Sequence, residues 1–128
     1  MRYGNDIETA LYERLTNDGI SASAHAIPAS LGNTLPHVHV VRTGGYTSDL
    51  VLETQNVDFD VYAANQADAM EEAENLCGWV RDLEGTTVGT PCYGAEVITL
   101  PYGNPDPRHP TLGRATLKAE LITRTKEG

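Results

Sequence analysis

The chain has 128 residues, enough for one domain with a single hydrophobic core and too few for two. It carries 18 acidic residues against 9 basic ones, a formal net charge of −9, and the basic residues are scattered along the sequence. This balance argues against a protein that wraps nucleic acid, which needs clustered Lys and Arg, and it is equally unfavourable for an anionic membrane surface.

The first predicted element is a helix over residues 7–17. Asp6 can cap it, since an aspartate side chain accepts a hydrogen bond from the first turn. Asp18-Gly19 then ends it, because glycine commonly follows the last helical residue. The apolar stripe that would face the core consists of Ile7, Ala10, Leu11 and Leu15.

A short strand is predicted over 21–27, followed by an exposed, turn-rich loop over 28–36. Residues 37–42 alternate as a strand, with Val38 and Val40 on one face. The segment that follows begins with Gly44-Gly45, and it joins this strand to the next one as an antiparallel hairpin.

The stretch from 50 to 84 organises the rest of the chain. Val57, Phe59 and Val61 alternate as one face of a strand, and the period then changes to that of a helix at Asn65, a suitable N-cap. Asp68 stands at the capping-box position. The helical residues expected to face the core are Ala69, Ala73, Leu76, Cys77, Val80 and Leu83.

After Gly85 the sequence predicts one strand over 95–100, an irregular loop over 101–110 with four prolines, and a last strand over 111–124. Residues 125–128 are expected to fray. The predicted fold is a single α+β domain over 1–128, with two layers: a mostly antiparallel β-sheet and two α-helices packed on one face of it. The residues of the last strand that would point inward are Ala115, Leu117, Ala119 and Leu121.

Neither cysteine belongs to a C-x-x-C motif, and Cys77 is expected to be a buried free thiol. No segment approaches the roughly 20 apolar residues needed to span a bilayer. The first 15 residues lack the apolar core of a signal peptide, so a cytosolic location is expected.

Two histidines and two aspartates are the only candidates for catalytic chemistry. His37 and His39 would share one side of a strand, and Asp58 and Asp60 one side of its neighbour, so the four could bind zinc or iron in a small metal-dependent enzyme. The alternative is an ordinary solvent-facing sheet surface, on which polar residues alternate in the same way. No nucleophile elbow, phosphate loop or dinucleotide motif is present, so the sequence reads as a structural or binding protein.

The order of these elements resembles the tail terminator, or tail completion, family of long-tailed bacteriophages and prophages. The likeness covers nearly the whole chain and rests on the succession of soft motifs rather than on a catalytic signature. The motifs are V-H-V-V-R-T-G-G at 38–45, D-F-D-V-Y-A at 58–63, A-D-A-M-E-E-A at 67–73 and P-D-P at 105–107.

The resemblance implies a structural virion protein without catalytic activity or cofactor. Such subunits form a homo-hexameric ring that caps the tail tube, ends tube polymerisation and presents a surface for the head. The implied partners are other copies of the chain, the tail tube protein and a head connector or neck protein, with DNA passing through the lumen unbound. The implied location is the virion tail, assembled in the bacterial cytoplasm. A head-tail connector, neck or other minor tail subunit is the near alternative.

The exposed hairpin and the proline-rich loop are the surfaces expected to contact these partners. Tyr46, at the tip of the hairpin, is the strongest candidate, since exposed aromatic side chains are favoured at interfaces. A mobile loop with no partner is the competing interpretation of the hairpin. The predicted interface residues are Arg42, Thr43, Gly44, Gly45, Tyr46, Asp49, Asp106 and Arg108.

Overall fold

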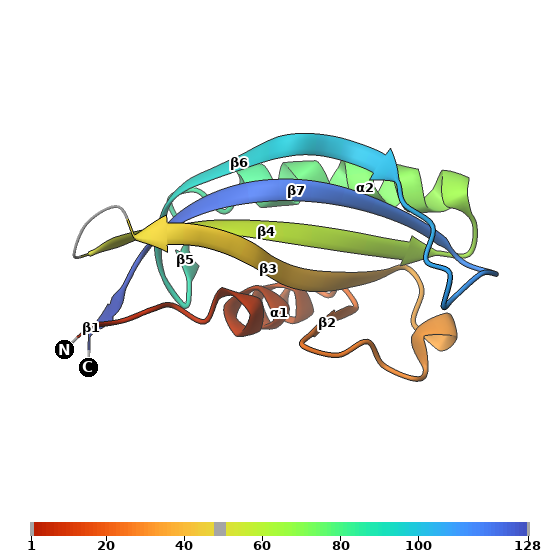
Figure 1. Ribbon diagram of the computed structural model, residues 1–128, viewed down its shortest axis with the longest axis horizontal. Coiled ribbons are helices and arrows are strands. Elements are labelled where there is room, and N and C mark those ends of the chain that lie inside the picture. Colours follow the sequence, from red (N-terminus) through yellow and green to blue (C-terminus); the bar gives the residue numbers. More distant parts are fainter. Residues whose placement is uncertain (1, 48–50, 128) are drawn as a thin grey trace.

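The computed structural model describes residues 2–47 and 51–127. Two long helices and four long strands make up most of the fold, with several short elements between them (Figure 1). In chain order the elements are β1 (Arg2–Tyr3), α1 (Ile7–Asn17), β2 (Ala22–Ala24), the 3-10 turn η1 (Leu31–Asn33), β3 (His37–Thr47), β4 (Leu52–Ala63), α2 (Gln66–Arg81), β5 (Thr87–Val88), β6 (Thr90–Gly103), β7 (Gly113–Arg124) and β8 (Lys126–Glu127).

The main sheet has the strand order β2-β3-β4-β7-β6-β5. Only the β2–β3 pair is parallel, and the other neighbours are antiparallel. Figure 1 shows the four long strands side by side, with α2 behind β6 and β7 and α1 beside β3. The predicted α+β fold, a mostly antiparallel sheet with two helices, is confirmed.

One core joins both helices to the same face of the sheet. The alternation predicted for β4 is correct, because Val57, Phe59 and Val61 are all buried. Asn65 caps α2 by accepting a hydrogen bond from the backbone N–H of Asp68 at 2.9 Å. Every inward residue predicted for the two helices and for β7 is buried, including Leu11, Leu15, Ala73, Val80, Leu117 and Leu121.

The two helices are also connected by an aromatic side chain. The indole N–H of Trp79, on α2, donates to Asp18, the C-cap residue of α1, at 2.8 Å. The Trp79 ring meets Phe59 of β4 edge to face, with ring centroids 6.2 Å apart. The ring is partly buried while its N–H keeps a partner, which is a favourable arrangement for tryptophan.

The hairpin is longer than the sequence predicted. Strand β3 continues through Gly44-Gly45 to Thr47, so the glycines lie inside the strand and not in the connection. The register shifts between Arg42 and Gly44, which marks a β-bulge. Gly44 and Gly45 have φ values of 150° and 140°, backbone angles that favour glycine. The pair therefore lets the strand bend without ending it.

Three other expectations about local structure were wrong. Strand β6 runs through Pro101 to Gly103. A proline is tolerated here because β6 has only β7 as a neighbour at this point among the described strands, and Pro101 falls at a shift in their register. The loop at 28–36 is not exposed throughout, since Leu31 packs inward at 1% exposure. Residues 126–127 do not fray but pair with Arg2–Tyr3. In the described part of the chain, no helix is long and apolar enough to cross a membrane.

Candidate functional site

The hairpin formed by β3 and β4 has an end that other elements do not cover. Residues Arg42 to Thr47 are all exposed, and the Tyr46 side chain is 63% exposed. Five of the predicted interface residues, Arg42, Thr43, Gly44, Gly45 and Tyr46, therefore lie together on one accessible surface. Asp49 lies outside the described residues. We call residues 42–47 the hairpin surface.

The outer side of β3 has no strand partner along this surface. Strand β2 pairs only with Val38–Val40, so beyond Val40 the only strand paired with β3 in residues 2–47 and 51–127 is β4. An unpaired strand presents backbone N–H and C=O groups that can bind another chain. The hairpin surface thus combines a free backbone edge with an exposed aromatic ring.

A second free edge, which the sequence did not reveal, lies on β6. Strand β5 pairs only with Thr90 and Pro91, and the rest of β6 is paired with β7 alone among the described strands. Six large apolar or aromatic side chains are exposed in the described part of the chain, and four of them belong to this strand. These four are Tyr93, Ile98, Leu100 and Tyr102, and we call them the β6 surface.

The β6 surface contains Leu100 at 63% exposure and Ile98 at 51%. Exposed apolar residues on one strand mark an interaction site more often than isolated ones do. The strand predicted over 95–100 includes Ile98 and Leu100, but the sequence alone did not indicate which face of that strand is exposed.

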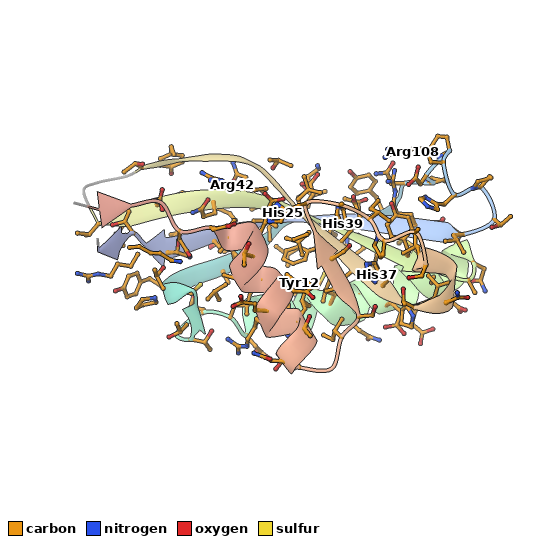
Figure 2. All side chains as sticks on the ribbon, turned by 90° about the horizontal axis from the view of Figure 1, so that it is seen from below. Tyr12, His25, His37, His39, Arg42 and Arg108 are labelled. Atoms are coloured by element: carbon orange, nitrogen blue, oxygen red, sulfur yellow. The ribbon has the colours of Figure 1, made fainter. Side chains whose placement is uncertain are left out.

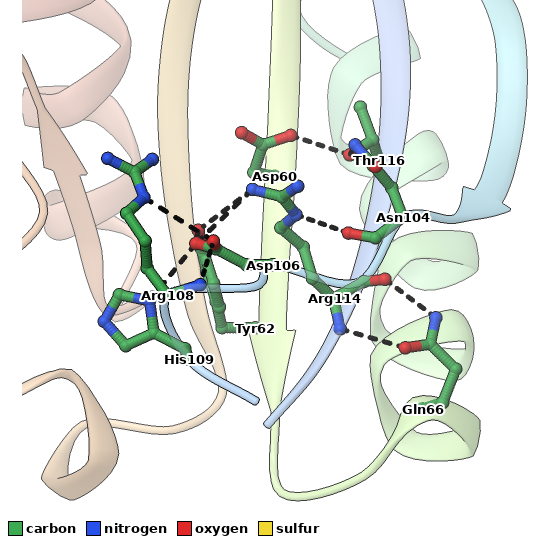
Figure 3. A network of polar contacts seen from close by, with 9 residues as sticks. All are labelled: Asp60, Tyr62, Gln66, Asn104, Asp106, Arg108, His109, Arg114 and Thr116. Carbon is green, nitrogen blue, oxygen red and sulfur yellow. Dashed lines mark hydrogen bonds and ion pairs between the residues drawn. The ribbon is translucent and has the colours of Figure 1, made fainter. Parts of the chain in front are cut away.

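The proline-rich loop between β6 and β7 is held by one buried carboxylate (Figure 3). Asp106 is 3% exposed, which contradicts its predicted place at an exposed interface. Its carboxylate accepts hydrogen bonds from the Tyr62 hydroxyl at 2.9 Å and from the Arg108 backbone N–H at 3.0 Å. The His109 ring meets it through Nδ1 at 3.1 Å.

The same cluster extends to the first residues of β7. Arg114 Nη1 lies 3.5 Å from the Asp106 carboxylate and 3.3 Å from the Tyr62 hydroxyl. The backbone of Arg114 exchanges two hydrogen bonds with the side chain of Gln66, in the first turn of α2. The loop is therefore joined to β4 and β7 by side chains that the sequence separates widely, and Gln66 joins α2 to the start of β7.

The electrostatics of this cluster follow from burial and hydrogen bonding. Burial alone would raise the pKa of Asp106, but the hydrogen bonds from Arg108, Tyr62 and His109, together with the charge of Arg114, hold that pKa far below its ordinary value. Burial raises the pKa of Tyr62. The cluster thus keeps an ionised carboxylate at Asp106 and a neutral phenol at Tyr62.

Arg108 remains accessible although its neighbour Asp106 is buried. Its side chain is 80% exposed, and its Nε lies 3.6 Å from the Asp106 carboxylate. The terminal guanidinium nitrogens have no hydrogen bond within the described residues. Of the two interface residues predicted in this loop, only Arg108 is thus available to a partner.

The two strand histidines are buried, contrary to the expectation of a solvent-facing surface. His37 is 2% exposed and His39 is 8% exposed, because the neighbouring segment that includes β2 covers them. His37 Nδ1 lies 2.7 Å from the Ser21 hydroxyl, while the Ser23 hydroxyl lies between His37 Nε2 and His39 Nδ1, at 2.8 Å and 2.7 Å. Burial lowers the pKa of both histidines.

The predicted neighbourhood of histidines and aspartates exists, since His39 pairs with Asp60 across β3 and β4. The aspartates, however, have other partners. Asp60 accepts a hydrogen bond from Thr116 at 2.7 Å, and Asp58 forms an ion pair with Lys118 at 2.8 Å. Within residues 2–47 and 51–127, no three His, Cys, Asp or Glu side chains are arranged to hold a metal ion.

Both cysteines are free and buried, as expected for Cys77. Burial raises the pKa of each thiol, which keeps it protonated and disfavours nucleophilic or metal-binding chemistry.

No protein-family model matches the chain, and a search of curated proteins finds no similar sequence either. Its function is therefore inferred from the surfaces described above.

Proposed function

We propose that this chain is a ring-forming structural subunit of a bacteriophage or prophage tail, of the tail terminator type. It would cap the tail tube as a homo-hexamer, end tube polymerisation and provide the surface to which the head is joined. It would act without catalysing a reaction and without a cofactor. Its location would be the tail of the virion, after assembly in the bacterial cytoplasm.

The observation that carries the proposal is the presence of two different exposed surfaces on opposite sides of the main sheet. The hairpin surface lies on β3, toward one end of the strand order, and the β6 surface lies toward the other. A cyclic ring uses two unlike surfaces on each subunit, because the contact runs head to tail. A two-fold dimer would need only one self-complementary surface.

The β6 surface is suited to contact through side chains rather than through a long backbone ladder. Its register against β7 shifts at three places, and Pro101 lacks a backbone N–H to donate. Bulges and prolines discourage open-ended strand addition, which protects an edge from aggregation. Ile98 and Leu100 can still pack against a neighbour, and burying them would supply the apolar centre of an interface.

The charge of the chain also agrees with a ring that surrounds DNA. A net charge of −9 on each copy would give the assembly a strongly negative field. Like charge keeps a passing duplex from binding the wall, so DNA would move through the lumen without specific contact. The remaining partners would be the tail tube protein on one side and a connector or neck protein on the other.

Light scattering across a concentration series tests the ring. The expected species has six times the chain mass of 13.8 kDa, either throughout or increasingly as concentration rises. Leu100→Asp and Tyr46→Asp place a charge on the two surfaces, and each is expected to leave a folded monomer. Tyr12→Asp is the matched control, since Tyr12 is an exposed aromatic residue on α1, away from both surfaces.

Two results would count against this assembly. If both surface variants keep the mass of the wild-type ring, neither surface forms the contact. If the wild type is monomeric at every concentration and also fails to limit the length of tubes assembled from a tail tube protein encoded beside it, the terminator role is wrong. Binding to a portal or neck protein without any effect on tube length would favour the connector alternative instead.

A further inference from the structure

An apolar hollow of about 130 Å³ lies between the segment that follows α1 and one face of α2. Val38 and Val61, which pair across β3 and β4, line it from the sheet. Ile20 lines it from the segment after α1, and Leu76 and Trp79 line it from α2. The hollow is therefore an opening at the seam where the two helices meet the sheet.

The polar side chains that line the hollow lie at its mouth. Glu72 and Asn75 are exposed, whereas Leu76 and the two strand residues of the lining are buried. Glu72, Leu76 and Trp79 follow one another on α2 at intervals of four and three residues, a spacing that places them on one helix face. One face of α2 thus supplies both an apolar wall and a carboxylate at the opening.

A second hollow, of about 300 Å³, adjoins the first, because Pro36 and Glu72 line both. Asp68 and Glu71 also line this second hollow. Among the described residues, no Lys, Arg or His side chain lines either of them. The carboxylates of Glu71 and Glu72 form no ion pair and no side-chain hydrogen bond within residues 2–47 and 51–127. The mouth of the apolar hollow therefore carries negative charge that no basic side chain pairs with.

The size of the apolar hollow limits what can enter it. A cavity of about 150 Å³ that is lined by Leu, Ile and Phe side chains is large enough to bind benzene. The hollow in this protein has a similar volume and is open to solvent on one side. A single apolar ring or a branched alkyl group would fill it, and a group attached to that ring would reach Glu72.

We propose that the hollow binds a small organic ammonium ion, with its apolar body inside and its ammonium group at Glu72. An anion of the same size would be repelled by Glu72 and by the neighbouring Asp68 and Glu71. An uncharged ligand would leave the carboxylate without a partner. The Trp79 ring also favours this class of ligand, since the face of an indole attracts a cation.

The site is separate from the two surfaces proposed for ring formation. Pro36 precedes the first residue of β3, His37, whereas the hairpin surface begins at Arg42. Figure 2 shows His37 well apart from Arg42. Strand β7 lies between β4, which lines the hollow, and β6 with its exposed apolar residues. Ligand binding therefore does not depend on the ring, and either proposal can fail without the other.

Titration of the full chain tests the site with two readouts. Trp79 is the only tryptophan, so its fluorescence reports on the hollow, and amide NMR signals of the lining residues give the second readout. Benzylammonium is the probe, benzyl alcohol the uncharged control and benzoate the anionic control. Benzylammonium is expected to change both readouts to saturation and to bind roughly fivefold more tightly than benzyl alcohol, as an exposed ion pair of good geometry allows. Benzoate is expected to change neither.

Two glutamate variants of α2 separate a specific site from general attraction to an acidic protein. Glu72→Gln removes the charge at the mouth and should weaken benzylammonium binding roughly fivefold while leaving benzyl alcohol binding unchanged. Glu74→Gln makes the same change outside the hollow, on a different face of the helix, and should leave both unchanged. Both side chains are exposed, so neither variant should unfold the protein.

Four outcomes would overturn the proposal. One is the absence of saturable changes with benzylammonium in both readouts. Another is equal affinity of the wild type for benzylammonium and benzyl alcohol, which would mean that the carboxylate takes no part. A third is an equal loss of benzylammonium binding in the two glutamate variants, which would indicate a diffuse electrostatic effect. The fourth is loss of binding at protein concentrations where light scattering detects oligomers, which would assign the hollow to contact with a second copy of the chain.

Discussion

The two segments that the sequence marks as contact surfaces are held in opposite ways. The hairpin surface projects from the sheet, and its six residues are exposed. Residues 101–110 look freer by composition, since they include four prolines, but the part of this segment that follows β6 is tied down through Asp106. Composition alone therefore does not show whether a loop is free to contact a partner or is held against the rest of the protein.

The difference lies in what orders each segment. The hairpin is ordered by its backbone ladder with β4 and by two glycines that permit its bend. The loop is ordered by side chains of β4 and β7 that converge on one buried carboxylate. Removing a single side chain should thus loosen the loop, whereas the hairpin should respond to changes in its backbone.

The largest expected effect is that of Asp106→Asn. The variant removes the buried charge that Tyr62, His109 and Arg114 face, and breaking a buried ionic cluster on one side is strongly destabilising. We expect the free energy of unfolding, measured by urea denaturation, to fall by about 3 kcal/mol. Asp82→Asn is the matched control: Asp82 is exposed at the end of α2, so its replacement should change stability by less than about 0.5 kcal/mol.

The dependence of this effect on pH has a definite sign. The pKa of Asp106 is lowered in the folded protein, so the carboxylate stabilises the fold fully above its ordinary pKa of 3.8. That contribution is lost as the pH falls below this value toward the lowered pKa. The difference in the free energy of unfolding between wild type and Asp106→Asn should therefore be constant near neutral pH and shrink in acid. If this difference in the free energy of unfolding already disappears near neutral pH, the carboxylate is not held ionised by the cluster.

On the hairpin, Gly45→Ala tests the backbone instead. A Cβ on Gly45 would lie 2.0 Å from the carbonyl oxygen of Thr54, and the φ of 140° is unfavourable for alanine. We expect a loss of about 2 kcal/mol in the free energy of unfolding and faster amide exchange at residues 43–47 and 51–55. Gly44→Ala, where φ is 150° but nothing lies within 4 Å, should cost only about 1 kcal/mol. Equal losses in the two variants would assign the whole cost to φ and none to the contact with Thr54.

The sequence predicted the fold well because its signals were local and periodic. Asn65 and a regular apolar stripe predict helix α2, and the strict alternation of apolar and polar residues predicts strand β7. The candidate site was predicted only in part, since its decisive contacts link distant residues. Nothing near Asp106 in the sequence indicates that Tyr62 and Arg114 lie against its carboxylate, and nothing near His37 indicates that Ser21 and Ser23 cover the strand. The β6 surface was missed because exposure of Ile98 and Leu100 depends on which strand occupies the edge.

The smallest expected effects concern two tyrosines, one that contacts the loop and one on the hairpin. The Tyr62 hydroxyl donates to Asp106 at 2.9 Å inside the protein, whereas Tyr46 projects from the hairpin at 63% exposure. Tyr62→Phe should lower the free energy of unfolding by about 1 kcal/mol, because the carboxylate loses a donor that water cannot readily replace. Tyr46→Phe makes the same chemical change and should alter stability by less than about 0.5 kcal/mol. If thermal unfolding gives equal losses for both, the hairpin is packed in solution as firmly as the loop, and Tyr46 is not free to meet a neighbouring subunit.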